Sequence, residues 1–154
     1  WFASTPTTPP TLPPVSPVPV LDAALSTSAA SRFLSDTGAT HVLLRRGALP
    51  SLRSIFTPRP LPSLEFSLPN GARLPVDGND TGVLSFPSKT TPVPCYICDD
   101  DTLAHNLVGA SPLIGSDGHA IYTSTSVDFY SPASPTPFLS GSKLRDEDLW
   151  SLNL

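Results

Sequence analysis

Proline sets the first limit on what this chain can fold into. The sequence of 154 residues contains 20 prolines. Proline lacks a backbone N–H and clashes with the preceding helical turn, so long helices are not expected. Hydrophobic residues nevertheless make up 39% of the chain, which is enough for the core of one modest domain. We therefore expect short strands and turns rather than a helical fold.

The prolines also divide the chain. Seven of them fall within residues 1–20, which predicts a Pro-rich, disordered linker over residues 1–30. This linker is interpreted as a semi-rigid spacer, with an SH3-type ligand as the alternative. A folded domain is predicted over residues 31–131. Residues 132–154 begin Pro- and Ser-rich and end in a period-two alternation, which predicts a linker followed by a strand-like tail.

Short apolar runs separated by turn residues characterise the predicted domain. Each run is too short for a helix, and several are rich in β-branched or aromatic residues. Pro69-Asn70-Gly71 separates two runs and predicts a hairpin turn, because Asn and Gly tolerate positive φ. The pattern predicts a small all-β barrel or sandwich. The runs are 33–34, 41–44, 64–66, 74–76, 83–86, 93–97, 121–122 and 127–130.

Charge and the absence of long apolar runs argue against two classes of partner. The net charge of −4 disfavours nonspecific nucleic-acid binding, which requires clustered Lys and Arg. No apolar run approaches the roughly 18 residues of a membrane-spanning helix. The first residues lack a signal-peptide pattern, and two cysteines do not form a disulfide framework, so we expect a cytoplasmic location. The start at Trp1 suggests a segment of a longer polypeptide.

The most informative string is Ser35-Asp36-Thr37-Gly38-Ala39-Thr40. Gly38 permits a tight turn and close backbone approach, so a second copy of the loop is expected to fit beside the first. The Thr37 hydroxyl is suited to bracing the paired loops. Two carboxylates brought this close share one proton, so that one activates water while the other donates to a carbonyl. This is the known arrangement of aspartic proteases. An isolated Asp-Thr-Gly also occurs as an ordinary Asx turn.

The order of motifs over residues 32–130 resembles that of retropepsins, a family of dimeric aspartic proteases. In that family the Asp-Thr-Gly-Ala loop leads into a strand, which residues 41–44 match. A hairpin flap follows, matched by residues 66–76, and then a further strand, matched by residues 82–86. Two apolar residues and a glycine then precede a short helix, as in Leu107-Val108-Gly109 before residues 110–114.

The resemblance extends to the protease segment of copia-type retrotransposon polyproteins. Three further strings match that segment in order, and two match the stretch that precedes the integrase region. After Gly109, residues 110–113 are only similar to the usual string. The five strings are Leu68-Pro69-Asn70-Gly71, Pro75-Val76-Asp77-Gly78, Asn106-Leu107-Val108, Gly141-Ser142-Lys143 and Leu149-Trp150.

The resemblance implies a fold and a set of roles. The fold would be a small closed all-β barrel with a hairpin flap and one short helix near residues 110–114. Asp36 would be the catalytic aspartate, held in an active-site loop with Thr37, Gly38 and Ala39. The remaining roles are a substrate-covering flap and a support for the loop. The flap comprises Leu68, Pro69, Asn70 and Gly71, and the support comprises Leu107, Val108 and Gly109.

The implied activity is endopeptidic cleavage without a metal or other cofactor. Because the chain contains one Asp-Thr-Gly, the active form would be a homodimer with one loop from each copy. Its substrate would be a polypeptide, foremost the parent polyprotein. One alternative is a catalytically silent barrel that acts as a spacer or interaction domain. Another is a cellular retropepsin-like domain within a ubiquitin-handling protein.

Several other polar residues are interpreted as structural. Cys95 and Cys98 form a Cys-x-x-Cys with His105 and His119 downstream, but residues three apart in a strand face opposite ways, so no zinc site is predicted. His41 is expected to be structural rather than a base for Asp36. Two charged segments are expected to be solvated, with no direct nucleic-acid contact. They are the turn 99–101 and the loop that carries Arg45, Arg46, Arg53 and Arg59.

Overall fold

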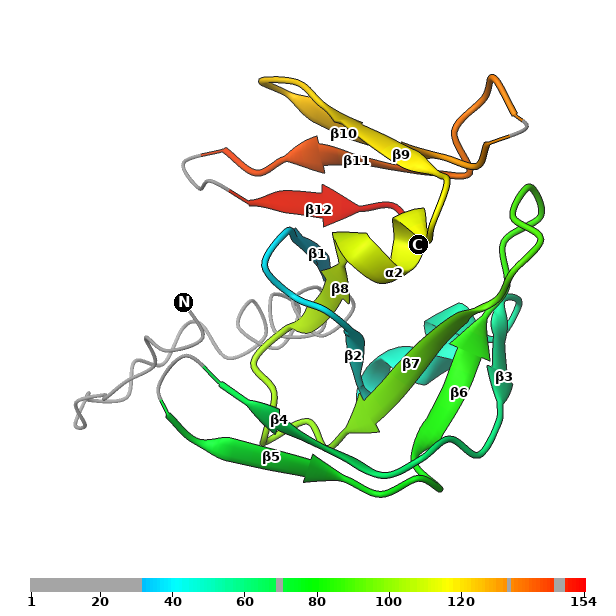
Figure 1. Ribbon diagram of the computed structural model, residues 1–154. Coiled ribbons are helices and arrows are strands. Elements are labelled where there is room, and N and C mark those ends of the chain that lie inside the picture. Colours follow the sequence, from blue (N-terminus) through cyan, green and yellow to red (C-terminus); the bar gives the residue numbers. More distant parts are fainter. Residues whose placement is uncertain (1–31, 69–70, 133, 146–148) are drawn as a thin grey trace.

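The computed structural model describes residues 32–68, 71–132, 134–145 and 149–154. The linker predicted over residues 1–30 lies outside the described residues, as do Pro69 and Asn70 of the predicted flap. The described part consists mainly of short strands (Figure 1). Among its helices, none is long and apolar enough to cross a bilayer.

One large sheet and one hairpin contain the strands of the described chain. The large sheet has the order β3-β6-β7-β2-β8-β1-β12-β11-β10-β9, and β4 pairs only with β5. Within the described residues, the helical elements are the 3-10 helix η2 (Arg46–Leu52) and the α-helix α2 (Ala110–Ile114). The strands are β1 (Phe33–Asp36), β2 (Val42–Arg45), β3 (Phe56–Pro58), β4 (Leu64–Ser67), β5 (Arg73–Val76), β6 (Thr81–Leu84), β7 (Val93–Cys98), β8 (Asn106–Gly109), β9 (His119–Tyr122), β10 (Ser126–Tyr130), β11 (Leu139–Lys143) and β12 (Trp150–Leu152).

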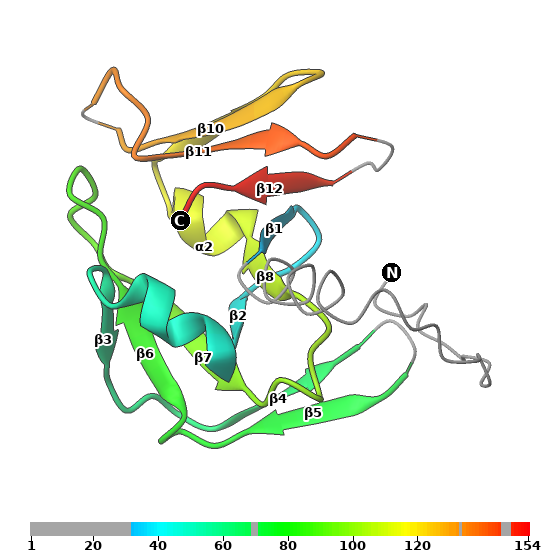
Figure 2. The same ribbon diagram turned by 180° about the vertical axis from the view of Figure 1, so that it is seen from behind.

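The large sheet curls without closing. Strands β9–β12 form one layer, β2, β6 and β7 form another, and α2 lies between them in views from both sides (Figure 1, Figure 2). The strand order ends at β3 and β9, which do not pair with each other. The mostly β architecture, the hairpin and the short helix at Ala110–Ile114 agree with the sequence-based prediction. The closed barrel is not seen in the described chain, where the sheet forms a curled half-barrel.

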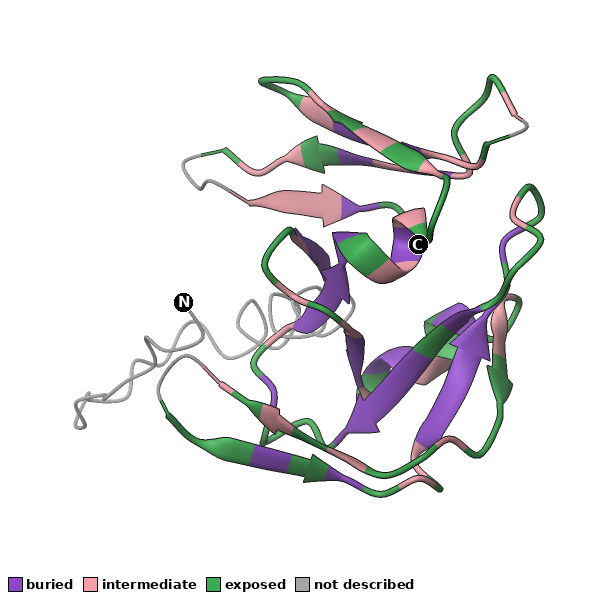
Figure 3. Ribbon diagram, in the orientation of Figure 1, coloured by how far each residue is buried: buried purple, intermediate pink, exposed green. Residues whose placement is uncertain are grey.

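The central strands are buried on both faces, which explains their nearly continuous apolar sequences. Successive side chains of a strand point to opposite faces. In β2, Val42 and Leu44 therefore enter one core cluster, while Leu43 enters a second. Burial is concentrated on the strands around β2, β6, β7 and β8, whereas β10 and β11 alternate between buried and more exposed residues and β9 has no buried residue (Figure 3). The first cluster faces α2 and η2, and the second faces the β4–β5 hairpin.

The predicted tail is an integral part of the large sheet. β12 pairs antiparallel with β1, with Ser35 opposite Trp150, and β11 continues the sheet on its other side. Leu139 and Leu152 are buried in the first cluster. Ser35 also shares a hydrogen bond of 3.1 Å with the hydroxyl of Tyr122 in β9. The domain boundary expected at residue 131 therefore falls inside the sheet, because β12, which lies in the predicted tail, pairs with β1.

The segment expected to be a solvated arginine-rich loop is structured. It contains η2, whose Ala48 and Leu52 are buried, and the edge strand β3. The Arg46 side chain forms ion pairs of 3.1 Å with both Asp80 and Asp99. The hydrogen bonds that Arg46 donates to Asp99 and to Asp80 raise the pKa of its guanidinium group. The pair with Asp99 joins η2 to the acidic turn after β7, and the pair with Asp80 joins η2 to the turn before β6. Both charged segments therefore form contacts across the chain, although Arg46 and Asp99 are exposed.

Candidate functional site

Asp36 stands at the end of β1, at the start of an exposed turn. The Gly38 backbone N–H donates to Asp36 Oδ1 at 2.8 Å, and the Ala39 N–H donates to the Asp36 carbonyl at 3.3 Å. These bonds form an Asx turn, which fixes the direction of the carboxylate. Thr37 and Gly38 are exposed, while Asp36 and Ala39 are half-buried. The turn is therefore ordered from within while its outer face remains open.

The loop after Asp36 is held against the end of β8. β1 and β8 run parallel with Asp36 opposite Gly109, and the Gly109 N–H donates to the His41 carbonyl at 3.1 Å. A Cβ on Gly109 would lie 2.5 Å from the Ala39 carbonyl oxygen, so the close approach requires glycine. Of the predicted supports, Gly109 contacts the loop directly. Leu107 and Val108 are buried in the second and first cluster, respectively.

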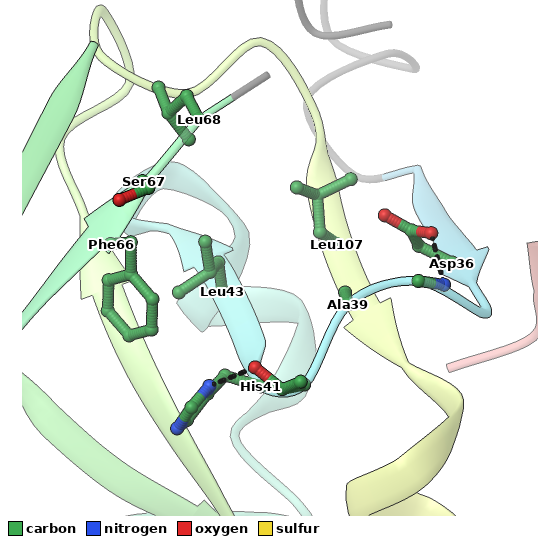
Figure 4. A pocket seen from close by; sticks show the side chains of 10 residues that line it. Asp36, Ala39, His41, Leu43, Phe66, Ser67, Leu68 and Leu107 are labelled. Carbon is green, nitrogen blue, oxygen red and sulfur yellow. Dashed lines mark hydrogen bonds between the residues drawn. The ribbon is translucent and has the colours of Figure 1, made fainter. Parts of the chain in front are cut away.

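A pocket of about 170 Å³ opens between this loop and the hairpin. Asp36 and residues 38–41 line one side, and residues 66–68 line the other. Leu43 and Leu107 complete the lining, from β2 and β8 (Figure 4). Among the described residues that line the pocket, only Asp36 carries a carboxylate. The pocket thus brings the predicted catalytic residue together with the predicted flap residue Leu68 and the predicted support Leu107.

The predicted hairpin is present and is formed by β4 and β5. Phe66 pairs with Leu74 and Ser67 with Arg73. The Leu68 N–H donates to the Ala72 carbonyl and the Gly71 N–H to the Leu68 carbonyl, each at 2.9 Å. Gly71 has a φ of 85°, the positive value that the turn signal predicted. The turn chemistry of the sequence is therefore sufficient to account for this hairpin.

His41 connects the two sides of the pocket, which sequence reasoning did not detect. Its Nδ1 forms a hydrogen bond of 2.8 Å with Thr40 Oγ1 rather than with Asp36. Its ring lies edge-on to Phe66, with centroids 5.1 Å apart, and to Tyr96, at 5.8 Å. Phe66 and Tyr96 are themselves 5.2 Å apart. The structural role predicted for His41 stays compatible with this arrangement, but no local pattern links residues so distant in sequence.

The two cysteines face different clusters, as strand geometry requires. Cys95 is buried in the first cluster and Cys98 in the second. Burial raises the pKa of Cys95 to about 12 and that of Cys98 to about 11, so both thiols stay protonated near neutral pH. Within the described part of the chain, no three His, Cys, Asp or Glu side chains gather into a metal-binding set.

Comparisons of the chain with family models, with curated proteins and with solved structures find no match. The function is therefore argued from the chemistry of the pocket and its two walls. The pocket combines one half-buried carboxylate, an exposed Gly-containing turn and a strand pair that lies across an apolar hollow.

Proposed function

We propose that this chain is an aspartic endopeptidase that acts as a homodimer, with Asp36 from each copy forming the catalytic pair. The observation that carries the proposal is the position of Asp36, at the wall of a pocket whose opposite wall is a hairpin. The proposed architecture is a retropepsin-like barrel half, with β4–β5 as the flap. Thr37, Gly38 and Ala39 hold the catalytic loop, and Gly109 supports it from β8.

The open face of the turn gives room for a second copy. Among the described atoms beyond its chain neighbours, a Cβ placed on Gly38 would meet only Asp36 Oδ1, at 3.4 Å. Thr37 is exposed, so its hydroxyl is available to a facing loop. With two Asp36 carboxylates at one axis, mutual repulsion keeps one proton on the pair. The ionised carboxylate takes a proton from water as the water attacks, and the protonated one donates to the carbonyl oxygen.

The substrate of this site is an extended polypeptide. A peptide lying between the hairpin and the Asp36 loop places one side chain in the apolar pocket and its backbone alongside β4. The copia-type motifs favour the parent polyprotein as the natural substrate. The products are two shorter polypeptides, and the reaction requires only water.

The proposal is tested by incubating the purified chain with an unfolded protein substrate at mildly acidic pH. Mass spectrometry identifies internal cleavage products. Asp36→Asn keeps the shape of the side chain but removes the acid–base group, so we expect the rate to fall by about 10² to 10⁴-fold. Asp101→Asn, at an exposed acidic position that does not line the pocket, is the matched control and should cleave normally.

Mixing the two forms tests the pairing of the two loops. Because each site needs two carboxylates, excess Asp36→Asn chain should inhibit wild-type cleavage by forming inactive mixed dimers. Cleavage that survives Asp36→Asn would refute the assignment of Asp36. If neither form cleaves any substrate, the alternative of a silent spacer or interaction domain is favoured.

A further inference from the structure

Three aromatic rings, those of His41, Phe66 and Tyr96, meet at the junction of the loop wall and the hairpin wall. His41 belongs to the loop after Asp36, Phe66 to β4 and Tyr96 to β7. Each pair is edge-to-face, with interplanar angles of 74° for His41 and Phe66, 78° for His41 and Tyr96, and 71° for Phe66 and Tyr96. Such contacts favour one relative position of the rings. The width of the pocket at this junction is therefore fixed by side chains rather than by backbone pairing.

His41 and Phe66 line the pocket (Figure 4). Tyr96 is not among the lining residues. Tyr96 is only 5% exposed, and burial raises the pKa of its hydroxyl. The imidazole of His41, a residue that lines the pocket, lies edge-on to the ring of Tyr96, which does not line it. Removing the imidazole would extend the hollow toward Tyr96 without removing Phe66 from the opposite wall.

We infer that His41 is the residue that sets the size of the substrate side chain accepted in the pocket beside Asp36. This inference deepens the proposed function and rests on it. The role is steric, because His41 Nδ1 is already engaged by Thr40 Oγ1 and the ring contacts are made by the imidazole edges and faces. In the wild type, the pocket of about 170 Å³ admits a side chain of aliphatic size beside Leu43 and Leu107. We expect the imidazole to disfavour an indole at this position.

The test uses extended peptides that differ only at one central residue, which is Ala, Leu or Trp. Specificity is expressed as the ratio of kcat/KM for the Trp peptide to that for the Leu peptide. His41→Ala should raise this ratio by about tenfold or more, because the enlarged pocket accommodates the indole. His41→Phe restores a ring of similar size at the same position and should return the ratio toward the wild-type value.

His119→Ala is the matched control for loss of a packed imidazole. His119 stacks on Tyr130 at 4.9 Å, in β9 and β10, and does not line the pocket. Its removal should leave the ratio unchanged even if it lowers stability. A ratio measured within each variant is insensitive to a partial loss of folded protein, whereas an absolute rate is not.

Binding separates this inference from the proposed activity. Fluorescence anisotropy measures the Kd of the same peptides, labelled at one end, for each His41 variant combined with Asp36→Asn. A shift of about tenfold in the Trp-to-Leu ratio of Kd supports the role of His41, even if wild-type chain shows no cleavage and the proposed activity fails. An unchanged ratio in His41→Ala, or the absence of any peptide binding, overturns the inference.

Discussion

The two walls of the pocket are built in different ways. The Asp36 wall belongs to β1, which is hydrogen-bonded to β8 on one side and to β12 on the other. The hairpin wall belongs to β4 and β5, which pair only with each other in the described structure. The hairpin is attached to the body by packing, with Leu74 and Val76 buried in the second cluster.

This difference implies a fixed position for the Asp36 carboxylate and more freedom of movement for the hairpin. Backbone ladders on both sides of β1 fix the carboxylate, and catalytic groups require such fixed geometry. Side-chain packing is less directional, so the hairpin is able to move against the body without breaking a strand ladder. We therefore expect changes at the Asp36 wall to affect the whole fold, and changes at the hairpin wall to have smaller and more local effects.

The largest effect is expected from removing residues 132–154. This truncation takes away β11 and β12, exposes an edge of β1 and deletes Leu139 and Leu152 from the first cluster. We expect loss of cooperative folding, measured by thermal unfolding followed by circular dichroism. A truncated chain with an unchanged melting temperature would show that β1 does not depend on its antiparallel partner.

A pair of glycine substitutions tests the Asp36 wall next. Gly109→Ala places a Cβ 2.5 Å from the Ala39 carbonyl oxygen and 2.8 Å from that of His41, so backbone must shift. We expect a loss of about 3 kcal/mol in the free energy of unfolding, measured in urea. Gly38→Ala is the control within the same loop, because within the described structure its Cβ would meet only Asp36 Oδ1, at 3.4 Å.

Gly38→Ala should therefore fold normally as a single chain, within about 1 kcal/mol of the wild type. If the proposed dimer forms, the added methyl group stands where the second loop approaches, and dimerisation measured by analytical ultracentrifugation should weaken. Equal destabilisation by both substitutions would contradict the contrast between a packed and an open face of the loop.

Local sequence patterns predicted the elements on both walls. The turn at Gly71 and the apolar run of β2 depend on residues that are neighbours in sequence, whereas the short helix after Gly109 was expected from the family resemblance. The two-face burial of β7 also follows from period-two geometry, which is sufficient to place Cys95 and Cys98 on opposite faces of the strand.

Such local patterns do not identify the pairing and packing partners of a residue when those partners are distant in sequence. The tail was predicted as a strand, but nothing in its sequence specifies that Trp150 lies opposite Ser35. The loop predicted to be solvated contains η2, because Ala48 and Leu52 are buried in the core and Arg46 forms ion pairs with two aspartates. For the same reason the sequence placed Asp36 and Leu68 in the site but gave no sign of the contact between His41 and Phe66.

The thiols on the two faces of β7 provide an intermediate test. The folded-state pKa of each is above the ordinary value of 9.0, so the unfolded chain releases the proton first as pH rises. The contribution of each raised pKa to the free energy of unfolding is fully present below pH 9. It is lost between pH 9 and about 11 to 12, because each thiol lowers the free energy of unfolding by about 1.4 kcal/mol per pH unit in that range. We expect Cys95→Ala to remove the contribution of one thiol from the slope of the free energy of unfolding against pH, measured by urea unfolding between pH 9 and 10.5.

The same thiols distinguish the two faces kinetically. Cys98 shares its cluster with Leu74 and Val76 of the hairpin, whereas Cys95 is enclosed by the first cluster. Opening of the hairpin alone would expose Cys98, so a thiol reagent added to native protein should modify Cys98 faster than Cys95. Equal rates would indicate that both react only after global unfolding, and the hairpin would then be no more mobile than the sheet.

The smallest effect is expected on the outer face of the hairpin. Arg73 pairs with Glu65 at 2.7 Å, but their side chains are 69% and 49% exposed, so solvent screens the pair. We expect Arg73→Ala to change the free energy of unfolding by at most about 0.5 kcal/mol. The neighbouring Leu74 is 8% exposed and packs on the body, so Leu74→Ala should cost about 2 kcal/mol or more, or should accelerate hydrogen exchange in β4 and β5. If Arg73→Ala were the more damaging of the two, the hairpin would be held by its own surface pair rather than by the second cluster, and its freedom to move over the pocket would need another explanation.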